Sequence, residues 1–265
     1  MKLKKTYLFI TMLFVQSIIA QDTITTFYDF NWKEIKNIES AAYYRKFFKS
    51  DEIYVANDYY KNGNIQMIGT YSNKKGTLRE GFFKYFHENG NIKSEGNYLK
   101  NQQTGNWKIY SDDGKLDSEG EYIKGKKNGI WIWYTENGNI CSKEVYKKDE
   151  RTSYTFFDEK GNDVNISDAE FLAKFNDGDA NDFTKWVFKN IKHLNENGVV
   201  HGRLLIEFIV NKVGEIEDIK VLSSVSPLID SEVIKVIKSS PKWSPAKMHN
   251  KYVKVRYVIP IYFNR

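Results

Sequence analysis

The C-terminal end of the chain carries an apolar residue at every second position. This alternation runs from Tyr252 to Phe263, with Lys254 and Arg256 on the opposite side. A period of two is typical of a strand with one buried face. Pro260 has no backbone N–H to donate, so we expect the strand to lie at an edge of its sheet or to leave the sheet there. Because an edge strand can pair with another chain, we take its apolar positions as candidate partner-binding residues, namely Val253, Val255, Tyr257, Ile259 and Ile261.

The elements before this strand alternate between helical and strand patterns. Residues 183–194 have helical spacing, residues 203–211 and 216–223 form two strands around Gly214, and Ser226-Pro227 begins a second helix that ends before Pro241. Trp243 and Pro245 are expected to fix the corner into the last strand. The order predicts a domain at 183–265 with a three-stranded antiparallel sheet and two helices.

Glycine and aromatic residues recur from residue 59 onward with a spacing close to 24. The turn glycines are separated by 27, 24, 24 and 23 residues, at Gly63, Gly90, Gly114, Gly138 and Gly161. A second series pairs a glycine with an aromatic residue two positions later, at Gly81 and Phe83, Gly105 and Trp107, and Gly129 and Trp131. A third series consists of Tyr71, Tyr98, Tyr122 and Tyr146. Three registers with one period indicate a structural repeat.

Each repeat has the pattern strand, turn, strand. Asn-Gly readily takes the positive φ angles of a tight hairpin turn, and stacked hairpins bury the aromatic series between them. Residues 59–162 are therefore expected to form a stacked antiparallel β-hairpin array. Residues 21–58 are expected to be an irregular start of this array. The predicted fold class is mainly β plus α+β.

Residues 163–182 are polar and predict a solvated linker. Asp177, Asp179 and Asn181 have the alternating spacing of a calcium loop, but its sixth position is Asp182 and not Gly, and its twelfth is Phe188 and not Glu. The linker interpretation is favoured over calcium binding.

The N-terminus has the pattern of an export signal at residues 1–20. Lys2, Lys4 and Lys5 precede an apolar run at 7–15, and Ala20 supplies a small residue before Gln21. The run is short for a membrane span, so cleavage and a periplasmic location are expected, with inner-membrane anchoring if the signal is retained. Removal of the three lysines leaves 37 basic against 34 acidic side chains, which gives no argument for nucleic-acid binding.

No motif points to catalysis or to a cofactor. The four histidines form no spaced pair of metal ligands, and the single cysteine, Cys141, cannot form an internal disulfide. No nucleophile elbow, phosphate-binding glycine loop or His-Glu-x-x-His sequence is present. We expect a protein that is not an enzyme and has no cofactor, no metal and no catalytic residue.

The repeats resemble the bacterial variant of the MORN repeat. The matching elements are Asn89-Gly90-Asn91-Ile92, Glu95-Gly96-Asn97-Tyr98 and Gly105-Asn106-Trp107. The resemblance implies the hairpin fold, and the family has no single shared activity.

The C-terminal segment resembles the C-terminal domain of TonB energy transducers. The matching pieces include Phe183-Thr184-Lys185-Trp186-Val187, the run from Gly214 to Val221, Pro241-Lys242-Trp243-Ser244-Pro245 and the run from Val253 to Ile261. The chain departs from the family pattern at His193-Leu194, where Tyr-Pro is usual, and it lacks a Pro-rich spacer, since it contains 4 prolines.

This resemblance implies a periplasmic domain that binds an extended segment of a TonB-dependent outer-membrane transporter by strand addition. Partners are then proteins of the cell envelope, with membrane contact only through them or through a retained signal. Two alternatives stay open. Lys254 and Arg256 also fit an edge that discourages pairing. The repeats could instead be the working surface, as an envelope scaffold or ligand-binding array, with the C-terminal domain structural.

Overall fold

The computed structural model describes residues 22–191 and 201–264. The predicted signal at 1–20 and the departure at His193-Leu194 lie outside these residues. The chain divides into two compact units, Met1–Asn91 with Tyr98–Asn101, and Ile92–Asn97 with Gln102–Arg265. Among the described residues, no helix is both long and apolar enough to cross a bilayer.

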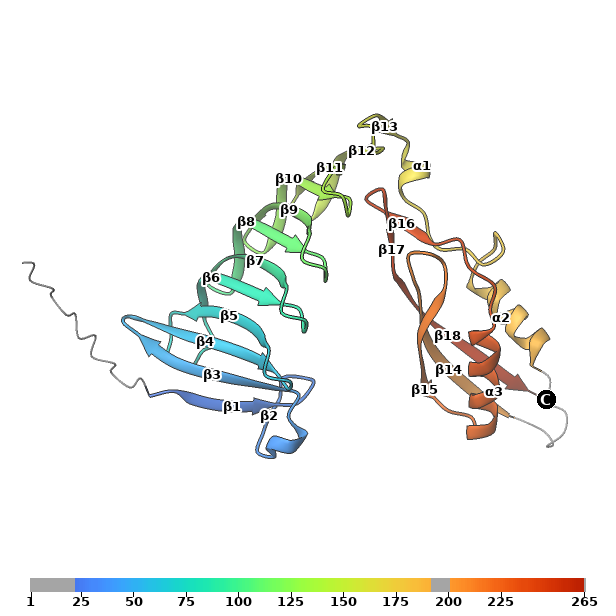
Figure 1. The fold of residues 1–265 in the computed structure, drawn as a ribbon, viewed down its shortest axis with the longest axis horizontal. Helices are drawn as coiled ribbons and strands as arrows, with labels where there is room; N and C mark the ends of the chain where they lie inside the picture. The colour runs from blue at the N-terminus through green and yellow to red at the C-terminus, as the bar shows by residue number, and fades with distance from the viewer. Residues whose placement is uncertain (1–21, 192–200, 265) are drawn as a thin grey trace, which may run out of the picture. The chain divides into compact units, whose positions relative to one another are not determined.

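Thirteen short strands form the repeat part of the chain (Figure 1). They pair antiparallel in the order β13 to β3, followed by β1 and β2. Their bounds are β1 Ile24–Tyr28, β2 Glu34–Ile35, β3 Tyr43–Ser50, β4 Ile53–Tyr60, β5 Ile65–Tyr71, β6 Arg79–Phe86, β7 Ile92–Leu99, β8 Gln102–Tyr110, β9 Leu116–Ile123, β10 Lys126–Tyr134, β11 Ile140–Lys147, β12 Glu150–Phe157 and β13 Asp163–Val164. The predicted stacked hairpin array is confirmed.

The first unit corrects the expectation of an irregular start at 21–58. Strands β3 and β4 pair over eight positions without a register shift, and a short 3-10 helix, Ile38–Ser40, precedes them. Aromatic rings on these strands pack on the sheet, as where Tyr44 stacks on Tyr59. The buried core of this unit consists of Phe47, Ala56, Met67, Tyr71 and Phe83. Arg45 donates two hydrogen bonds to the buried carboxylate of Asp58, at 2.6 and 2.8 Å.

In the second unit, each repeat packs a tryptophan ring over a glycine of the adjacent strand. Trp107 and Trp131 are 2% and 0% exposed. A Cβ atom at Gly96 or Gly120 would lie 2.4 Å from the ring of Trp107 or Trp131, respectively. The glycines are therefore required because the ring occupies the space of a side chain.

The C-terminal part of the second unit is an α+β domain with a three-stranded antiparallel sheet in the order β15-β14-β18. Figure 1 shows two helices, α2 and α3, on one face of this sheet. The bounds are α2 Ala180–Asn190, β14 His201–Val210, β15 Ile216–Ser223, α3 Pro227–Lys238 and β18 Val255–Asn264. Ser226 caps α3 with Pro227 in its first turn, as predicted. A separate hairpin of β16 Ala246–Met248 and β17 Lys251–Val253 precedes β18.

Residues 163–182 are not a solvated linker. After the four-residue helix α1, Ile166–Ala169, the chain pairs with the β16 region through the bridges Phe171–Lys247 and Lys174–Ser244. Ala173 and Phe175 are 5% and 2% exposed and belong to the core of the α+β domain. Asp179, which the calcium pattern included, caps α2 in a reciprocal capping box with Asp182.

Candidate partner-binding site

The apolar face of the last strand faces the core of the α+β domain. Ile259 and Ile261 are 4% and 0% exposed. Val253, Val255 and Tyr257 are partly buried and pack against the same core. The alternation was therefore a correct signal of burial. The side chains of the five candidate residues do not point to a partner, so a partner could reach these residues only through their main chain.

The outer side of β18 is the edge that the sequence predicted. β18 ends the sheet order, and among the described residues its outer side pairs with no strand. On the face away from the helices, Val258 and Tyr262 are 46% and 56% exposed. Arg256 on this face lies 3.5 Å from Glu207 of β14, and Lys254 lies 2.5 Å from Glu217 of β15, so both predicted edge charges are paired within the sheet.

Pro260 defines which amides of β18 point outward. It lies opposite Leu205 of β14 in an unbroken register. Proline is accommodated in a paired strand only where its nitrogen faces away from the neighbour. Residues of the same parity, Arg256, Val258 and Tyr262, are therefore expected to direct their N–H groups to the open edge.

The β16–β17 hairpin carries a polar residue pair at its tip. His249 and Asn250 have φ angles of 53° and 57°, the left-handed values of a tight hairpin turn. The backbone of Asn250 donates to the carbonyl of Ala169 at 3.1 Å. The turn thus projects the imidazole away from the hairpin, toward the last repeats.

The last repeats hold this imidazole in a cluster that we call the hairpin socket, formed by Trp133, Ser142, Glu144, Tyr146 and Arg151. The ring of His249 stacks on Trp133 with centroids 4.1 Å apart. Its Nδ1 lies 2.5 Å from Oε1 of Glu144, which is 0% exposed. Ser142 and Tyr146 donate to the same carboxylate at 2.9 and 2.8 Å.

Burial and hydrogen bonding have opposite effects on the pKa of Glu144 and the same effect on the pKa of Tyr146. Burial raises the pKa of Glu144, but the contacts with His249, Tyr146 and Ser142 outweigh it and hold this pKa at about 2. Burial raises the pKa of Tyr146, and its hydrogen bond to Glu144 raises it further. Burial lowers the pKa of Lys127, whose Nζ lies 4.3 Å from the centroid of Trp131.

A metal ion has little room in this cluster. Glu144, Glu170 and His249 bring ligand atoms within 4.8 Å of one another. Arg151, however, donates to both oxygens of Glu170 at 2.6 and 2.7 Å and lies 3.3 Å from Glu144. The guanidinium thus occupies oxygens of both carboxylates that a metal ion would need, and the contacts are those of an ion-pair network.

Glu144 interrupts a glycine series of the repeats. Gly96 and Gly120 stand two positions before Tyr98 and Tyr122, and Glu144 stands two positions before Tyr146. The preceding glycines make room for a tryptophan ring. In the last of these repeats the carboxylate of Glu144 takes this position and contacts His249 at the tip of the hairpin. Sequence reasoning missed the socket, although this single departure from the repeat was a visible signal.

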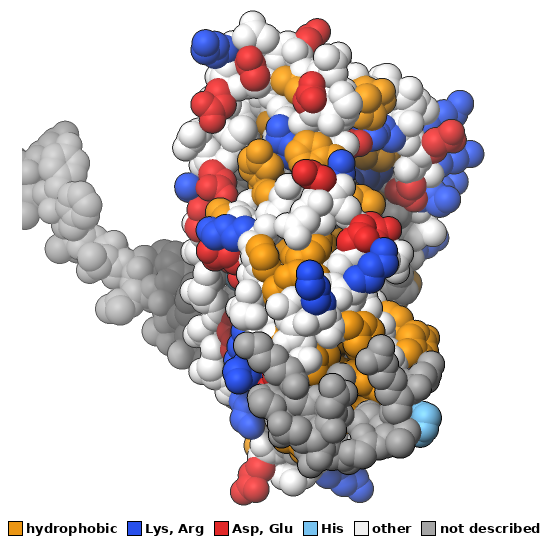
Figure 2. All heavy atoms as spheres, turned by 90° about the vertical axis from the view of Figure 1, so that its right-hand side faces the viewer, with side chains coloured by type: hydrophobic (Ala, Val, Ile, Leu, Met, Phe, Trp, Pro, Cys, Tyr) orange, Lys and Arg blue, Asp and Glu red, His pale blue; other side chains and the backbone are white. Residues whose placement is uncertain are grey.

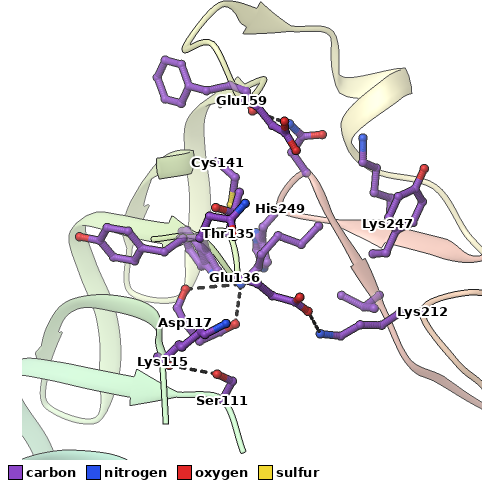
Figure 3. A pocket seen from close by; sticks show the side chains of 18 of the residues that line it. Ser111, Lys115, Asp117, Thr135, Glu136, Cys141, Glu159, Lys212, Lys247 and His249 are labelled. Carbon is purple, nitrogen blue, oxygen red and sulfur yellow. Dashed lines mark hydrogen bonds and ion pairs between the residues drawn. The ribbon is translucent and has the colours of Figure 1, made fainter. Parts of the chain in front are cut away.

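A cavity of about 790 Å³ lies beside the socket, between the turns of the last repeats and the hairpin (Figure 3). Four of its charged side chains form two ion pairs. Lys251 contacts Asp117 at 2.5 Å, and Lys212 contacts Glu136 at 2.7 Å. Burial raises the pKa of the Cys141 thiol to about 11, so the thiol is protonated at neutral pH and is a poor nucleophile.

Acid should weaken the socket. The pKa of Glu144 in the folded chain, about 2, lies below its ordinary value of 4.5. Its contribution to stability is therefore present above about pH 4.5 and is lost as the pH falls toward 2, with an upper bound of about 3 kcal/mol. Urea unfolding at pH 7, 5 and 3 should show a larger loss for the natural chain than for Glu144→Gln. Parallel pH profiles of the two proteins would contradict the assignment.

Comparison with known proteins matches two family models to this chain. A model described as the Gram-negative bacterial TonB protein C-terminal matches residues 196–264, and a MORN repeat variant matches residues 56–73, 79–100, 103–124 and 127–148. No curated protein matches. A crystal structure of a GtfA/B complex bound to UDP and GlcNAc is similar over 49% of this chain and 26% of that chain, with 9% identity and a TM-score of 0.23. This chain thus spans about a quarter of that one, a likeness that carries no functional argument.

Proposed function

We propose that this chain, which joins MORN-variant repeats to a TonB-type C-terminal domain, is a non-enzymatic protein-binding module of the Gram-negative cell envelope. Its site is the outer edge of β18, which takes up an extended segment of a partner by strand addition. The domain match supports a periplasmic location and a TonB-dependent outer-membrane transporter as the partner. The observation that carries the proposal is the position of β18 at the end of its sheet, with Val258 and Tyr262 exposed beside the edge.

The surface chemistry supports a protein partner over a nucleic acid. Figure 2 shows the face toward the right of Figure 1, where basic and acidic side chains are interspersed and neither sign forms a continuous patch. A phosphate backbone requires a basic stripe, whereas main-chain pairing at a strand edge requires no net charge. The paired charges of the cavity and the protonated thiol of Cys141 supply no catalytic group, which supports a binding role.

A proline at position 258 should abolish strand addition. Val258→Pro removes an N–H that we place at the open edge, whereas Val258→Thr keeps this N–H and a similar side-chain shape. Full-length proteins are used to capture a TonB-dependent transporter from envelope extract, with folding checked by near-UV circular dichroism. We expect capture by the natural chain and by Val258→Thr, and at least about tenfold less by a folded Val258→Pro protein, which corresponds to about 1.4 kcal/mol.

The same experiment tests the second candidate function, in which the repeats bind an envelope component. A loop at the start of the array supports this second function because it exposes an aromatic side chain. Asp29 accepts hydrogen bonds from the backbones of Asn31 and Lys33, and Phe30, which follows Asp29, is 81% exposed. Trp32 in this loop stacks on Tyr43. Equal capture by all three proteins would exclude the β18 edge and transfer the function to the array.

A further inference from the structure

The hairpin in the socket leads directly into the strand proposed to bind a partner. β17 ends at Val253 and β18 begins at Val255, so Lys254 alone separates them. A displacement of the hairpin tip at Asn250 therefore reaches Val255 through the four residues between them. The hairpin is the covalent neighbour of the partner edge.

The hairpin contacts four consecutive strands of the array. Lys251 binds Asp117 of β9, and His249 stacks on Trp133 of β10 and contacts Glu144 of β11. Asn250 donates its side-chain amide to the carbonyl of Phe157 in β12 at 2.6 Å. These four contacts come from three adjacent residues of the hairpin. Because the contacts are spread over four strands, they hold the tip of the hairpin at one place on the array.

Release of the hairpin would remove contacts from a buried carboxylate and a buried indole. Glu144 is 0% exposed and Trp133 is 4% exposed in the docked state. Without His249 the carboxylate loses one hydrogen-bonding partner, and the indole loses the ring that covers it. Loss of a hydrogen bond at a buried carboxylate and of the ring that covers a buried indole are both unfavourable, so the docked hairpin is preferred.

The charged groups around the socket are paired with one another. Glu144 and Glu170 are balanced by Arg151, which pairs with both, and by Lys127, which lies over the neighbouring rings. Lys251 is paired with Asp117. His249 adds to this network through the contact between its Nδ1 and Oε1 of Glu144.

We propose that the hairpin socket is an internal docking site through which the repeat array controls the partner strand, so that the first residues of β18 keep their pairing geometry only while His249 is docked. This inference rests on the proposed function for the identity of β18 as the partner strand. In this proposal the array holds the residues immediately before the binding edge in a fixed position, which a flexible spacer would not do.

Two substitutions remove the contact between the hairpin and the socket. Glu144→Gly installs the residue that the preceding repeats carry at this position. His249→Gly removes the ring at a φ of 53°, which glycine adopts readily. Met248→Ala is the matched control, since this side chain lies on the same hairpin and is 52% exposed. Near-UV circular dichroism confirms that each full-length variant folds.

Amide hydrogen exchange of the full-length proteins tests the proposal without a partner. We expect exchange at residues 251–258 to rise at least about tenfold in Glu144→Gly and in His249→Gly, and to stay unchanged in Met248→Ala. Residues 216–223 of β15, in the same sheet, should keep their protection in all variants. Unchanged exchange at 251–258 in both socket variants would overturn the proposal.

Transporter capture then separates this inference from the proposed function. If the socket variants exchange faster at 251–258 and also capture less transporter, the array controls the binding edge. If they exchange faster and capture as much as the natural chain, control of the partner strand is overturned. If the natural chain captures no transporter while the exchange result holds, the proposed function fails and the docking of the hairpin to the array stands on its own.

Discussion

Alanine at position 120 is expected to lower the free energy of unfolding by about 3 kcal/mol or more, although the substitution adds a single methyl group. Gly120 lies opposite Trp131 on the adjacent strand. A Cβ atom there would lie 2.4 to 2.5 Å from three atoms of the indole. Trp131 is 0% exposed and donates its Nε1–H to the carbonyl of Glu121 at 3.1 Å. A shift of the ring to make room for the methyl group would therefore disrupt its packing and this hydrogen bond.

A double-mutant cycle separates this steric effect from other consequences of the methyl group. Trp131→Ala alone should cost about 3 to 5 kcal/mol. In that background Gly120→Ala should change stability by less than about 0.5 kcal/mol, because no ring remains for the methyl group to displace. Urea unfolding followed by circular dichroism gives the four stabilities. Additive effects would show that Gly120 is required for a reason other than the tryptophan.

The repeat array could be predicted from the sequence because its information is local. Gly120 and Trp131 lie 11 residues apart, and the same pair recurs at Gly96 and Trp107. Each strand meets only the strands next to it, so one period specifies every neighbour. For the same reason the alternation in the last strand correctly predicted which side chains are buried, including Ile259 and Ile261.

The segment at 163–182 could not be predicted because its partners are distant. Its composition is polar, and the residues that enter the core are few, such as Ala173 and Phe175. Their burial depends on backbone pairing with Ser244 and Lys247, more than 65 residues away. The polar composition of the segment correctly indicates that most of its side chains are solvated. It gives no indication of backbone pairing with residues far along the chain.

The hairpin socket was partly visible in the sequence and partly beyond it. The replacement of a repeat glycine by Glu144 marks the position as unusual. Nothing in one sequence indicates that the partner is His249, which lies 105 residues later. The turn His249-Asn250 also lacks a glycine, so its left-handed backbone gave no strong signal.

Alanine at position 214 should unfold the α+β domain, whereas alanine at position 161 should be tolerated. The two glycines have nearly the same backbone conformation, with φ angles of 83° and 84°. Alanine in this conformation costs about 1 to 2 kcal/mol at either position. At Gly161 a Cβ atom would meet nothing within 4 Å, whereas at Gly214 it would lie 1.9 Å from the backbone oxygen of Trp243.

The clash at Gly214 cannot be relieved by rotating a side chain, because the obstructing atom belongs to the backbone. The carbonyl of Gly214 also accepts the N–H of Trp243 at 2.8 Å, and this bond holds the corner before the hairpin. Trp243 is 2% exposed, and its ring lies 5.1 Å from that of Tyr257 in β18. Displacement of the corner therefore opens the core beneath the partner strand, and we expect a loss of about 4 kcal/mol or more.

Urea unfolding and near-UV circular dichroism of Gly214→Ala and Gly161→Ala measure the difference directly. The Gly161→Ala protein should keep its aromatic signal. Its free energy of unfolding should fall only by the conformational cost of alanine at this φ angle. The Gly214→Ala protein should lose the signal of the tryptophan corner and, with it, the ordered edge of β18 and the capture of a transporter. Equal stabilities of the two variants would mean that the backbone at Trp243 can move away from the added Cβ atom at little cost in free energy. The partner strand would then depend less on this corner than on the hairpin socket.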